Sequence, residues 1–280
     1  MINQKILSQI KEKQPRIHSI TNTITINDCA NVILAAGGSA TMASAPEETA
    51  EMTSLCDGLV LNLGAVSSAD AAASLSAMKE AGKAANRLGH PVVFDPVAAG
   101  ATTLRRKACQ TLLREVQFHA IRGNASEIHA LSALCDESSC QEPPLSATGN
   151  TSFIDAAPSQ IMQEKNAEQC LTDARRLCEL TKAVVVVSGV CDLIVSEETY
   201  EIHKGGSPLS AHITGSGCML TELICTCLAA DPNEPFDAVC TAVDWMNAAA
   251  EKAARKTQAA EGGTMTFRMY LIDEIYRFTL

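Results

Sequence analysis

The stretch AHITGSGCML, residues 211–220, is the most informative part of this sequence for choosing between kinds of α/β fold. Gly215 and Gly217 stand directly before an apolar run that is typical of a buried helix. A glycine turn at a helix N-terminus presents unpaired backbone N–H groups together with the positive end of the helix dipole. The stretch therefore predicts a cradle for an anion such as a phosphate, although a plain glycine turn that begins a helix has the same pattern.

The same stretch argues against the commonest nucleotide-binding motifs. Its spacing, Gly-x-Gly-x-x-Leu, lacks the third glycine of a dinucleotide fingerprint, and it lies late in the chain rather than after a first strand. The chain contains no Gly-x-x-x-x-Gly-Lys-Ser/Thr, so a P-loop is excluded. It also lacks the His-Arg-Asp and Asp-Phe-Gly motifs of protein kinases. The predicted anion cradle therefore belongs to an α/β protein of a kind other than these three.

Outward from this stretch, apolar runs of strand type alternate with helical patterns. GLVLNLG (58–64), PVVFDP (91–96) and AVVVVSG (183–189) are continuous apolar runs, as in strands that are buried on both faces. Strands separated by helices predict a parallel sheet that helices cover on both faces. DLIVSE (192–197) and YEIHKG (200–205) follow each other closely and predict an antiparallel hairpin, so we expect a mixed sheet.

One segment departs from this alternation. Residues 135–167 are polar, rich in serine and proline, and without periodicity. A loop of this length is usually a lid, a surface insertion or a disordered excursion. Because strand patterns resume after it, we predict a single domain over residues 1–280 with a polar insert at about 135–167.

Composition excludes several classes of partner. With 22 Lys and Arg against 32 Asp and Glu, the formal net charge is -10, and no basic stripe offsets it, so nucleic acid is not an expected partner. The start, MINQKILSQIKEKQ, has no apolar stretch of signal-peptide type, and no segment approaches the length of a membrane span, which predicts a cytoplasmic protein without a membrane partner. The 12 cysteines contain no Cys-x-x-Cys, and we expect reduced thiols that mostly pack as small apolar side chains.

Three polar residues follow strand patterns and are candidate ligand groups. Asp95 ends a buried run, and open α/β sheets bind ligands at the carboxyl ends of their strands. Asn124 and Glu127 stand three residues apart at the start of a helix and so share one face. Mg²⁺ takes oxygen ligands, including one or two carboxylates beside a phosphate, which makes Asp95 and Glu127 candidate ligands. The alternatives are that Asp95 caps a loop and that Asn124 and Glu127 form a capping box.

Cys218 lies at the start of the helix that follows the cradle. A helix N-terminus lowers the pKa of a thiol and increases its thiolate fraction. A thiolate at this position could accept a proton from a substrate hydroxyl. The alternative is that Cys218 is a small residue that fits a tight turn.

Taken together and in order, these motifs resemble the hydroxyethylthiazole kinases. The stretches that carry the resemblance are HSITNTITINDCANVILAAGGSATMA (18–43), VLNLGAV (60–66), PVVFDPVAAGATTLR (91–105), IRGNASEI (121–128), VVVSGVCDLI (185–194), HKGGSPLSAHITGSGCML (203–220) and GGTMTFRMYLIDEIY (262–276). The resemblance extends over about four fifths of the chain. It implies a ribokinase-like three-layer α/β/α fold with a mostly parallel central sheet.

The resemblance also implies a reaction. Such a kinase transfers the terminal phosphate of ATP, with Mg²⁺, to the hydroxyl of 4-methyl-5-(2-hydroxyethyl)thiazole, for thiamine biosynthesis and salvage. It implies a homotrimer with the thiazole alcohol bound between subunits. Asn22, Met42 and Gly215 would contact the thiazole. Gly215 and Gly217 would form the anion hole for the transferred phosphate, and Cys218 would occupy the place of the catalytic Asp of ribokinase-like sugar kinases.

The nucleotide side of the site is implied in the same way. Arg122, Ser188 and Asn124 would bind ATP, while Asp95 and Glu127 would hold Mg²⁺ and phosphate oxygens. Ser188 departs from the threonine that the family carries there, but the hydroxyl is kept. The polar insert is longer than in the family and lacks its usual glycine-rich link ending in Val-Asp-Ser.

Two other functions fit parts of the pattern. A related kinase of the same fold could act on a pyrimidine alcohol or a pyridoxal-like vitamin, and only the pocket around Asn22 and Met42 would distinguish it. A nucleotide-binding protein without turnover is the other alternative. The combination of Asp95, Glu127 and Cys218 argues against it, because a protein that only binds nucleotide needs no proton acceptor beside the cradle.

Overall fold

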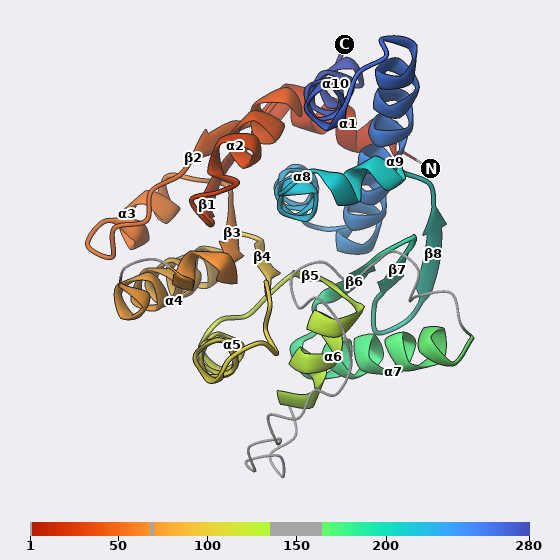
Figure 1. Cartoon of the computed structure of the whole chain (residues 1–280). Coiled ribbons are helices and arrows are strands. Elements are labelled where there is room, and N and C mark those ends of the chain that lie inside the picture. The colour runs from red at the N-terminus through yellow and green to blue at the C-terminus, as the bar shows by residue number, and fades with distance from the viewer. Residues whose placement is uncertain (1, 68–69, 135–163) are drawn as a thin grey trace.

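The computed structural model describes residues 2–67, 70–134 and 164–280, and within them the centre of the molecule is an eight-stranded sheet (Figure 1). The strands are β1 (Arg16–Ile20), β2 (Ser39–Thr41), β3 (Gly58–Asn62), β4 (Val92–Asp95), β5 (Ala120–Asn124), β6 (Val184–Ser188), β7 (Cys191–Val195) and β8 (Tyr200–Lys204). Their order across the sheet is β2-β1-β3-β4-β5-β6-β7-β8. Neighbouring strands from β2 to β6 are parallel, whereas β7 pairs antiparallel with both β6 and β8. The predicted mixed sheet and hairpin are therefore confirmed.

Helices cover both faces of this sheet (Figure 1). One face carries α1 (Gln4–Lys13), α2 (Ile26–Ala35), α8 (Ser216–Ala230), α9 (Pro235–Ala259) and α10 (Thr264–Arg277). The other carries α4 (Ala71–Leu88), α5 (Thr103–Glu115), α6 (Ala125–Leu134) and α7 (Glu164–Thr181), with the short α3 (Thr49–Ser54) packed on α4. Two short 3₁₀ helices, Leu63–Ser67 and Pro208–His212, complete the described elements. This is the three-layer α/β/α architecture that the resemblance implied.

The helix α8 is the central element of its layer. It packs on β1, β3, β4 and β5 and is itself covered by α1, α2 and α9. Leu223, Ile224 and Leu228 are fully buried, as expected for a helix that is apolar on all sides and surrounded by protein. Among the helices that the structure describes, α8 included, none is both long enough and apolar enough to span a membrane.

Among the described strands and α-helices, three were not predicted. Helix α7 buries Cys170, Ala174, Leu177 and Cys178, and this helical spacing is weak as a sequence signal because two of the four are cysteines. Strand β2 and helix α3 are too short to show a period. Most of the predicted polar insert, residues 135–163, lies outside the described residues, and its predicted end at 167 is wrong because α7 begins at Glu164.

Candidate active site

The polar residues of the candidate site lie along one edge of the sheet. Strands β1 and β3 to β6 run parallel, so their carboxyl ends meet at the same edge, which is where open α/β sheets bind ligands. Asn62 at the end of β3 pairs with Asp95 at the end of β4. Asn124 at the end of β5 pairs with Ser188 at the end of β6. The N-terminal part of α8 lies over this edge, because Cys218 contacts Asn62 and Thr221 contacts Asp95.

The centre of the site is the fully buried carboxylate of Asp95. Its Oδ2 atom accepts hydrogen bonds from Asn62 Nδ2 at 3.0 Å and from Thr221 Oγ1 at 3.1 Å. Its Oδ1 atom accepts no hydrogen bond among the described residues and lies 3.9 Å from Arg122 Nη1. Burial raises the pKa of Asp95 to about 6, and the positive charge of Arg122 limits that rise. At neutral pH Asp95 is therefore mainly ionised, with one oxygen available to a cation.

Asn62 was not among the predicted site residues, although the stretch that contains it was recognised. Its Nδ2 group donates to Asp95 and lies 3.2 Å from Cys218 Sγ, and its Oδ1 accepts from Gly64 N at 2.8 Å. A lone asparagine at the end of a buried apolar run is the available signal, since Asp95 ends the next run in the same way. Asn62 thus connects the carboxylate to the start of α8.

Cys218 lies between two asparagine side chains. Asn62 Nδ2 and Asn22 Nδ2 donate to its Sγ atom at 3.2 Å and 3.7 Å. Burial raises the pKa of Cys218 to about 12, and the nearby charge of Asp95 acts in the same direction. The helix dipole is too weak to offset this desolvation, because its effect on a nearby charge is typically about 0.3–1 kcal/mol. The expectation of an increased thiolate fraction is therefore wrong, and Cys218 is a protonated thiol at neutral pH.

The two glycines of the cradle are required by close contacts. Gly215 has φ +88°, and a Cβ atom there would lie 2.7 Å from Thr25 Cγ2. A Cβ atom on Gly217 would lie 2.2 Å from Arg122 Nη1. No side chain caps the N-terminus of α8, so its first N–H groups stay available to a ligand. The geometry agrees with the predicted anion cradle and adds a guanidinium group beside it.

Two residues with a predicted role in ATP binding are in direct contact. Arg122, on β5, donates from Nη2 to Ser188 Oγ at the end of β6. Ser188 Oγ in turn donates to the carbonyl oxygen of Gly123 at 3.3 Å. The Arg122 side chain is largely buried and reaches from Ser188 towards Asp95 and Gly217. One cation therefore joins the nucleotide side of the predicted site to the cradle.

Asn124 and Glu127 form the contacts of a capping box. Asn124 Oδ1 accepts from Glu127 N, and Glu127 Oε2 accepts from Asn124 N, each at 2.9 Å. Glu127 Oε1 accepts from Ala98 N at 2.8 Å, which ties the loop after β4 to the start of α6. The capping alternative thus describes the observed contacts. Each carboxylate oxygen keeps a second lone pair, so the predicted roles of Asn124 with ATP and of Glu127 with Mg²⁺ stay open.

The two predicted thiazole contacts lie at the β1 and β2 end of the same edge. Asn22 follows β1, and its Oδ1 accepts from the N–H groups of Ile24 and Thr25. Met42 follows β2, the edge strand beside β1. The neighbouring Ala43 carbonyl contacts Nε2 of the buried His18 at 2.9 Å, which holds this loop against β1. The structure thus places Asn22 and Met42 at adjacent strand ends, and their contact with substrate stays a prediction.

A second buried carboxyl group lies one turn into α8. Glu222 is fully buried, and its Oε1 accepts from Ser19 Oγ on β1 at 2.6 Å. Burial raises the pKa of Glu222 to about 8, against the opposite effect of hydrogen bonds from Ser19 and Cys29. Glu222 is therefore mostly protonated at neutral pH. It joins α8 to the strand that leads into Asn22.

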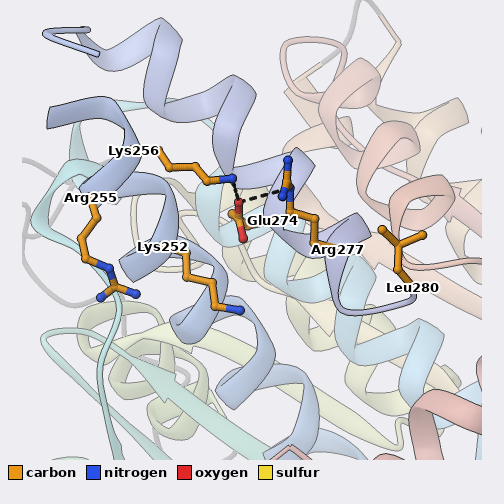
Figure 2. A pocket seen from close by; sticks show the side chains of 6 residues that line it. All are labelled: Lys252, Arg255, Lys256, Glu274, Arg277 and Leu280. Carbon is orange, nitrogen blue, oxygen red and sulfur yellow. Dashed lines mark hydrogen bonds and ion pairs between the residues drawn. The ribbon is translucent and has the colours of Figure 1, made fainter. Parts of the chain in front are cut away.

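A shallow pocket elsewhere on the molecule is separate from this site. It has a volume of about 450 Å³ and is lined by Lys252, Arg255, Lys256, Glu274, Arg277 and Leu280 (Figure 2). The buried carboxylate of Glu274 binds Lys256 and lies 3.5 Å from Arg277 Nε. Two of the four cationic side chains that line the pocket are therefore already paired with a carboxylate. None of the polar residues at the strand ends lines this pocket.

Comparison with known proteins agrees with the fold and identifies the family. A model of the hydroxyethylthiazole kinase family matches residues 7–140 and 154–280. The hydroxyethylthiazole kinase of Desulfovibrio desulfuricans is 39% identical over 275 residues, which are 96% of this chain and 90% of that protein. A solved hydroxyethylthiazole kinase structure from Pyrococcus horikoshii OT3 has a TM-score of 0.79 at 29% identity and covers 98% of this chain and 92% of that one. The chain shares only its fold with a ribokinase-like superfamily protein from Enterococcus faecalis V583. That structure has a TM-score of 0.60 at 13% identity, and the match covers 99% of this chain and 95% of that one.

The family match makes this chain a kinase, which takes ATP as co-substrate, and its three-layer fold carries the polar row beneath the glycine cradle. The family match extends over nearly the whole length of the chain, and the Desulfovibrio relative is similar across both halves of the sheet. The chain belongs to the hydroxyethylthiazole kinase family.

Replacing Gly217 with alanine should weaken ATP binding without unfolding the protein. The added Cβ would displace the flexible end of Arg122 from Ser188 and Asp95. We expect the affinity to fall about tenfold or more, because a hydrogen bond to a charged group contributes about 1.5–3 kcal/mol. Titration calorimetry with ATP measures the change. Gly263→Ala, where a Cβ would meet nothing within 4 Å, is the matched control, and unchanged affinity in Gly217→Ala would contradict the position of the guanidinium.

Replacing Glu222 with glutamine should change how stability depends on pH. The pKa of Glu222 in the folded protein, about 8, lies above its ordinary value of 4.5, so the folded state holds this proton more tightly than the unfolded state. The wild type therefore loses stability as pH rises from about 4.5 to about 8, by about 1.4 kcal/mol for each unit, and loses little more above pH 8, whereas the glutamine variant is spared this loss. Urea unfolding at pH 6 and pH 9 measures the difference. The exposed Glu198→Gln is the control, and parallel pH profiles for wild type and Glu222→Gln would refute the buried-acid assignment.

Proposed function

We propose that this protein phosphorylates the hydroxyl of 4-methyl-5-(2-hydroxyethyl)thiazole with ATP, in thiamine biosynthesis and salvage. The observation that carries the proposal is the uncapped glycine cradle of α8 above a buried carboxylate, in a chain of the hydroxyethylthiazole kinase family. Transfer of a phosphoryl group depends mainly on positioning and on neutralising negative charge. Backbone N–H groups, a guanidinium and a carboxylate at one edge of a rigid sheet are suited to both tasks.

The phosphate end of the site would be formed by the cradle and its neighbours. The N–H groups at 215–218 and the guanidinium of Arg122 take up charge on the γ-phosphate, while Arg122 and Ser188 hold the nucleotide, with Asn124 beside them. Mg²⁺ fits the available oxygen of Asp95, since this cation is typically held by one or two carboxylates plus phosphate and water. Glu127, in the first turn of α6 after the next strand, is the second proposed ligand. Mg²⁺ supplies further neutralisation of phosphate charge.

The alcohol end would lie towards β1 and β2. The thiazole is contacted by Asn22, Met42 and the Gly215 backbone. These contacts direct the hydroxyl of the substrate at the cradle. Cys218, held between two asparagine amides, orients this hydroxyl as a neutral thiol. Its raised pKa of about 12 supports orientation over proton abstraction. In a loose transition state the proton acceptor contributes modestly, so this role is compatible with efficient transfer.

Assembly and location complete the proposal. We propose a homotrimer with the alcohol between subunits, because Met42 follows the edge strand β2 and Ile24, in the loop after Asn22, is 78% exposed. An edge strand and an exposed isoleucine beside the substrate residues are suited to contact with a second subunit. We also propose a cytoplasmic location. A monomeric sedimentation profile would contradict the trimer.

The first test is ADP release by purified protein with Mg²⁺ and ATP. We expect turnover with the thiazole alcohol and little without it. The hydroxymethylpyrimidine is the control substrate, because turnover with it alone would move specificity to a related kinase while keeping the fold and the cradle. If folded protein binds ATP but releases no ADP with either alcohol, it is a nucleotide-binding protein and the proposal fails.

Replacing Cys218 with alanine should leave a substantial part of the activity, with kcat reduced about tenfold or less, because the thiol does not act as the base. Replacing Gly215 with leucine should abolish activity, since a side chain there would clash with Thr25 and fill the cradle. Steady-state kinetics of both variants provide the measurement. A loss above about a thousandfold in Cys218→Ala would show that proton transfer through this thiol is essential.

A further inference from the structure

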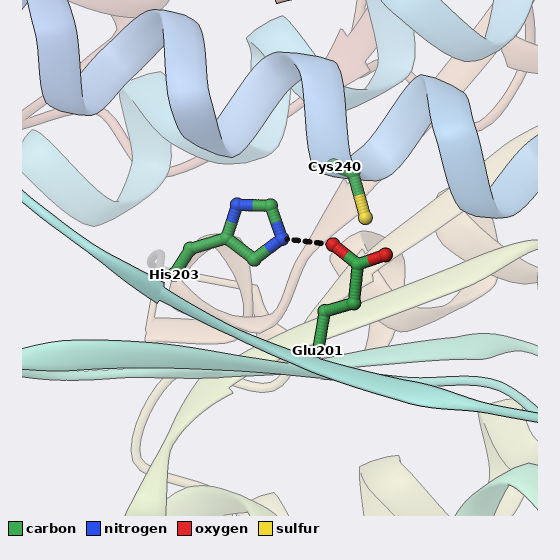
Figure 3. A group of neighbouring side chains, drawn as sticks. All are labelled: Glu201, His203 and Cys240. Atoms are coloured by element: carbon green, nitrogen blue, oxygen red, sulfur yellow. Dashed lines mark hydrogen bonds and ion pairs between the residues drawn. The ribbon is translucent and has the colours of Figure 1, made fainter. Parts of the chain in front are cut away.

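A group of potential metal ligands lies at the junction of β8 and α9. Glu201 and His203 stand two residues apart on β8, so their side chains share one face of the strand. Cys240 faces them from α9, and Figure 3 shows the three side chains pointing towards one another. Their donor atoms all lie within 4.8 Å of one another. None of the three belongs to the strand-end site described above, and β8 is the last strand at the opposite edge of the sheet from β2.

The donor types are those of a zinc site. An imidazole nitrogen, a cysteine sulfur and a carboxylate oxygen are all common Zn²⁺ ligands, whereas Mg²⁺ and Ca²⁺ select oxygen. Tetrahedral Zn²⁺ with its usual bond lengths separates such donors by about 3.3–3.8 Å. His203 Nε2 and Glu201 Oε2 are already 3.0 Å apart. The Glu201 side chain is 56% exposed and can adjust, so closing the group around an ion requires side-chain movement only.

An outer carboxylate fixes the histidine in the orientation that a metal requires. Asp244 Oδ1 lies 2.7 Å from His203 Nδ1, and the histidine side chain is only 7% exposed. A proton on Nδ1 donated to Asp244 leaves the lone pair of Nε2 directed at Glu201 and Cys240. This carboxylate–histidine arrangement is typical of zinc sites, where it orients the ring and raises its basicity. Cys240 and Asp244 are four residues apart on α9 and therefore share one helix face.

Carboxylate groups lie close to the three proposed ligands. Glu201 and Asp244 contact the histidine, and Asp237 lies three residues before Cys240 on the same helix face. A protonated His203 paired with Glu201 and Asp244 would account for the two carboxylates. It would not account for the thiol that completes the group, and this difference makes Cys240 the residue to test.

We propose that Glu201, His203 and Cys240 bind one Zn²⁺ ion, with water as the fourth ligand. Cys240 loses its thiol proton to solvent on binding, as every metal-bound cysteine does. The ion would join the edge strand β8 to α9 and so fix a part of the sheet that only one strand pairing holds. Asn247, two turns beyond Cys240 on α9, donates to Asp192 Oδ2, and Asp192 Oδ1 accepts from Gly189 N beside Ser188. The junction is thus continuous with the nucleotide side of the active site.

Cobalt provides a direct test, because Co²⁺ in such a site gives a thiolate charge-transfer band and visible ligand-field bands. The full chain, without a histidine tag and stripped with a chelator, is titrated with Co²⁺ and then with Zn²⁺. We expect saturation at one Co²⁺ per chain and displacement by Zn²⁺. Cys240→Ser should lose the charge-transfer band. Cys191→Ser, which removes a partly buried thiol on the neighbouring strand, should keep it.

Affinity and melting measurements complete the test. We expect Zn²⁺ to raise the melting temperature of the wild type and of Cys191→Ser, and to leave that of Cys240→Ser unchanged. Glu201→Gln, at an exposed position, should fold normally and bind Zn²⁺ at least tenfold more weakly. Absence of stoichiometric binding by the wild type, or equal binding by Cys240→Ser, would reduce the group to an ion pair of His203 and overturn the proposal.

Discussion

The site depends on keeping the carboxylate of Asp95 charged inside the protein. An ionised group without water is unfavourable unless hydrogen bonds and an opposite charge replace the solvent. Asn62, Thr221 and Arg122 supply them, and they come from β3, α8 and β5. The relative positions of two neighbouring strands and of the helix above them are therefore linked to one carboxylate. This network also sets the cradle, because the same helix begins at Gly215 and carries Cys218.

Burial determines the chemistry of the ionisable groups along this edge. The pKa of Asp95 rises only to about 6, because Arg122 offsets part of the desolvation. Arg122 has a smaller effect on Cys218, where burial dominates, and burial likewise dominates at Glu222, so their pKa values rise to about 12 and about 8. Asp95 is therefore charged and lies beside the cation Arg122, whereas Cys218 and Glu222 are neutral. Such an arrangement concentrates negative charge where a metal–phosphate complex would approach and keeps the alcohol side uncharged.

The parts of the molecule that could be predicted from sequence are those with a local signal. The buried strands, the glycine turn that begins α8 and the place of Asp95 at the end of a buried strand each depend on a short pattern, and the structure confirms these positions. The position of Asn62 could not be deduced, because its role depends on the register between β3 and β4. The protonation of Cys218 could not be deduced either, since burial by distant segments outweighs the local helix dipole. Helix α7 was missed because cysteines form part of its buried face.

The position of α8 in the chain has a consequence for biosynthesis. This helix covers β1, β3, β4 and β5, yet its residues 216–230 are synthesised long after residue 124, where β5 ends. A ribosome-bound chain therefore carries one apolar face of its first strands without their cover until α8 has left the exit tunnel. During that interval the nascent protein presents the kind of surface that chaperones bind and that favours aggregation. Misfolding is thus most able to reduce the yield of this enzyme while the segments before α8 are being translated.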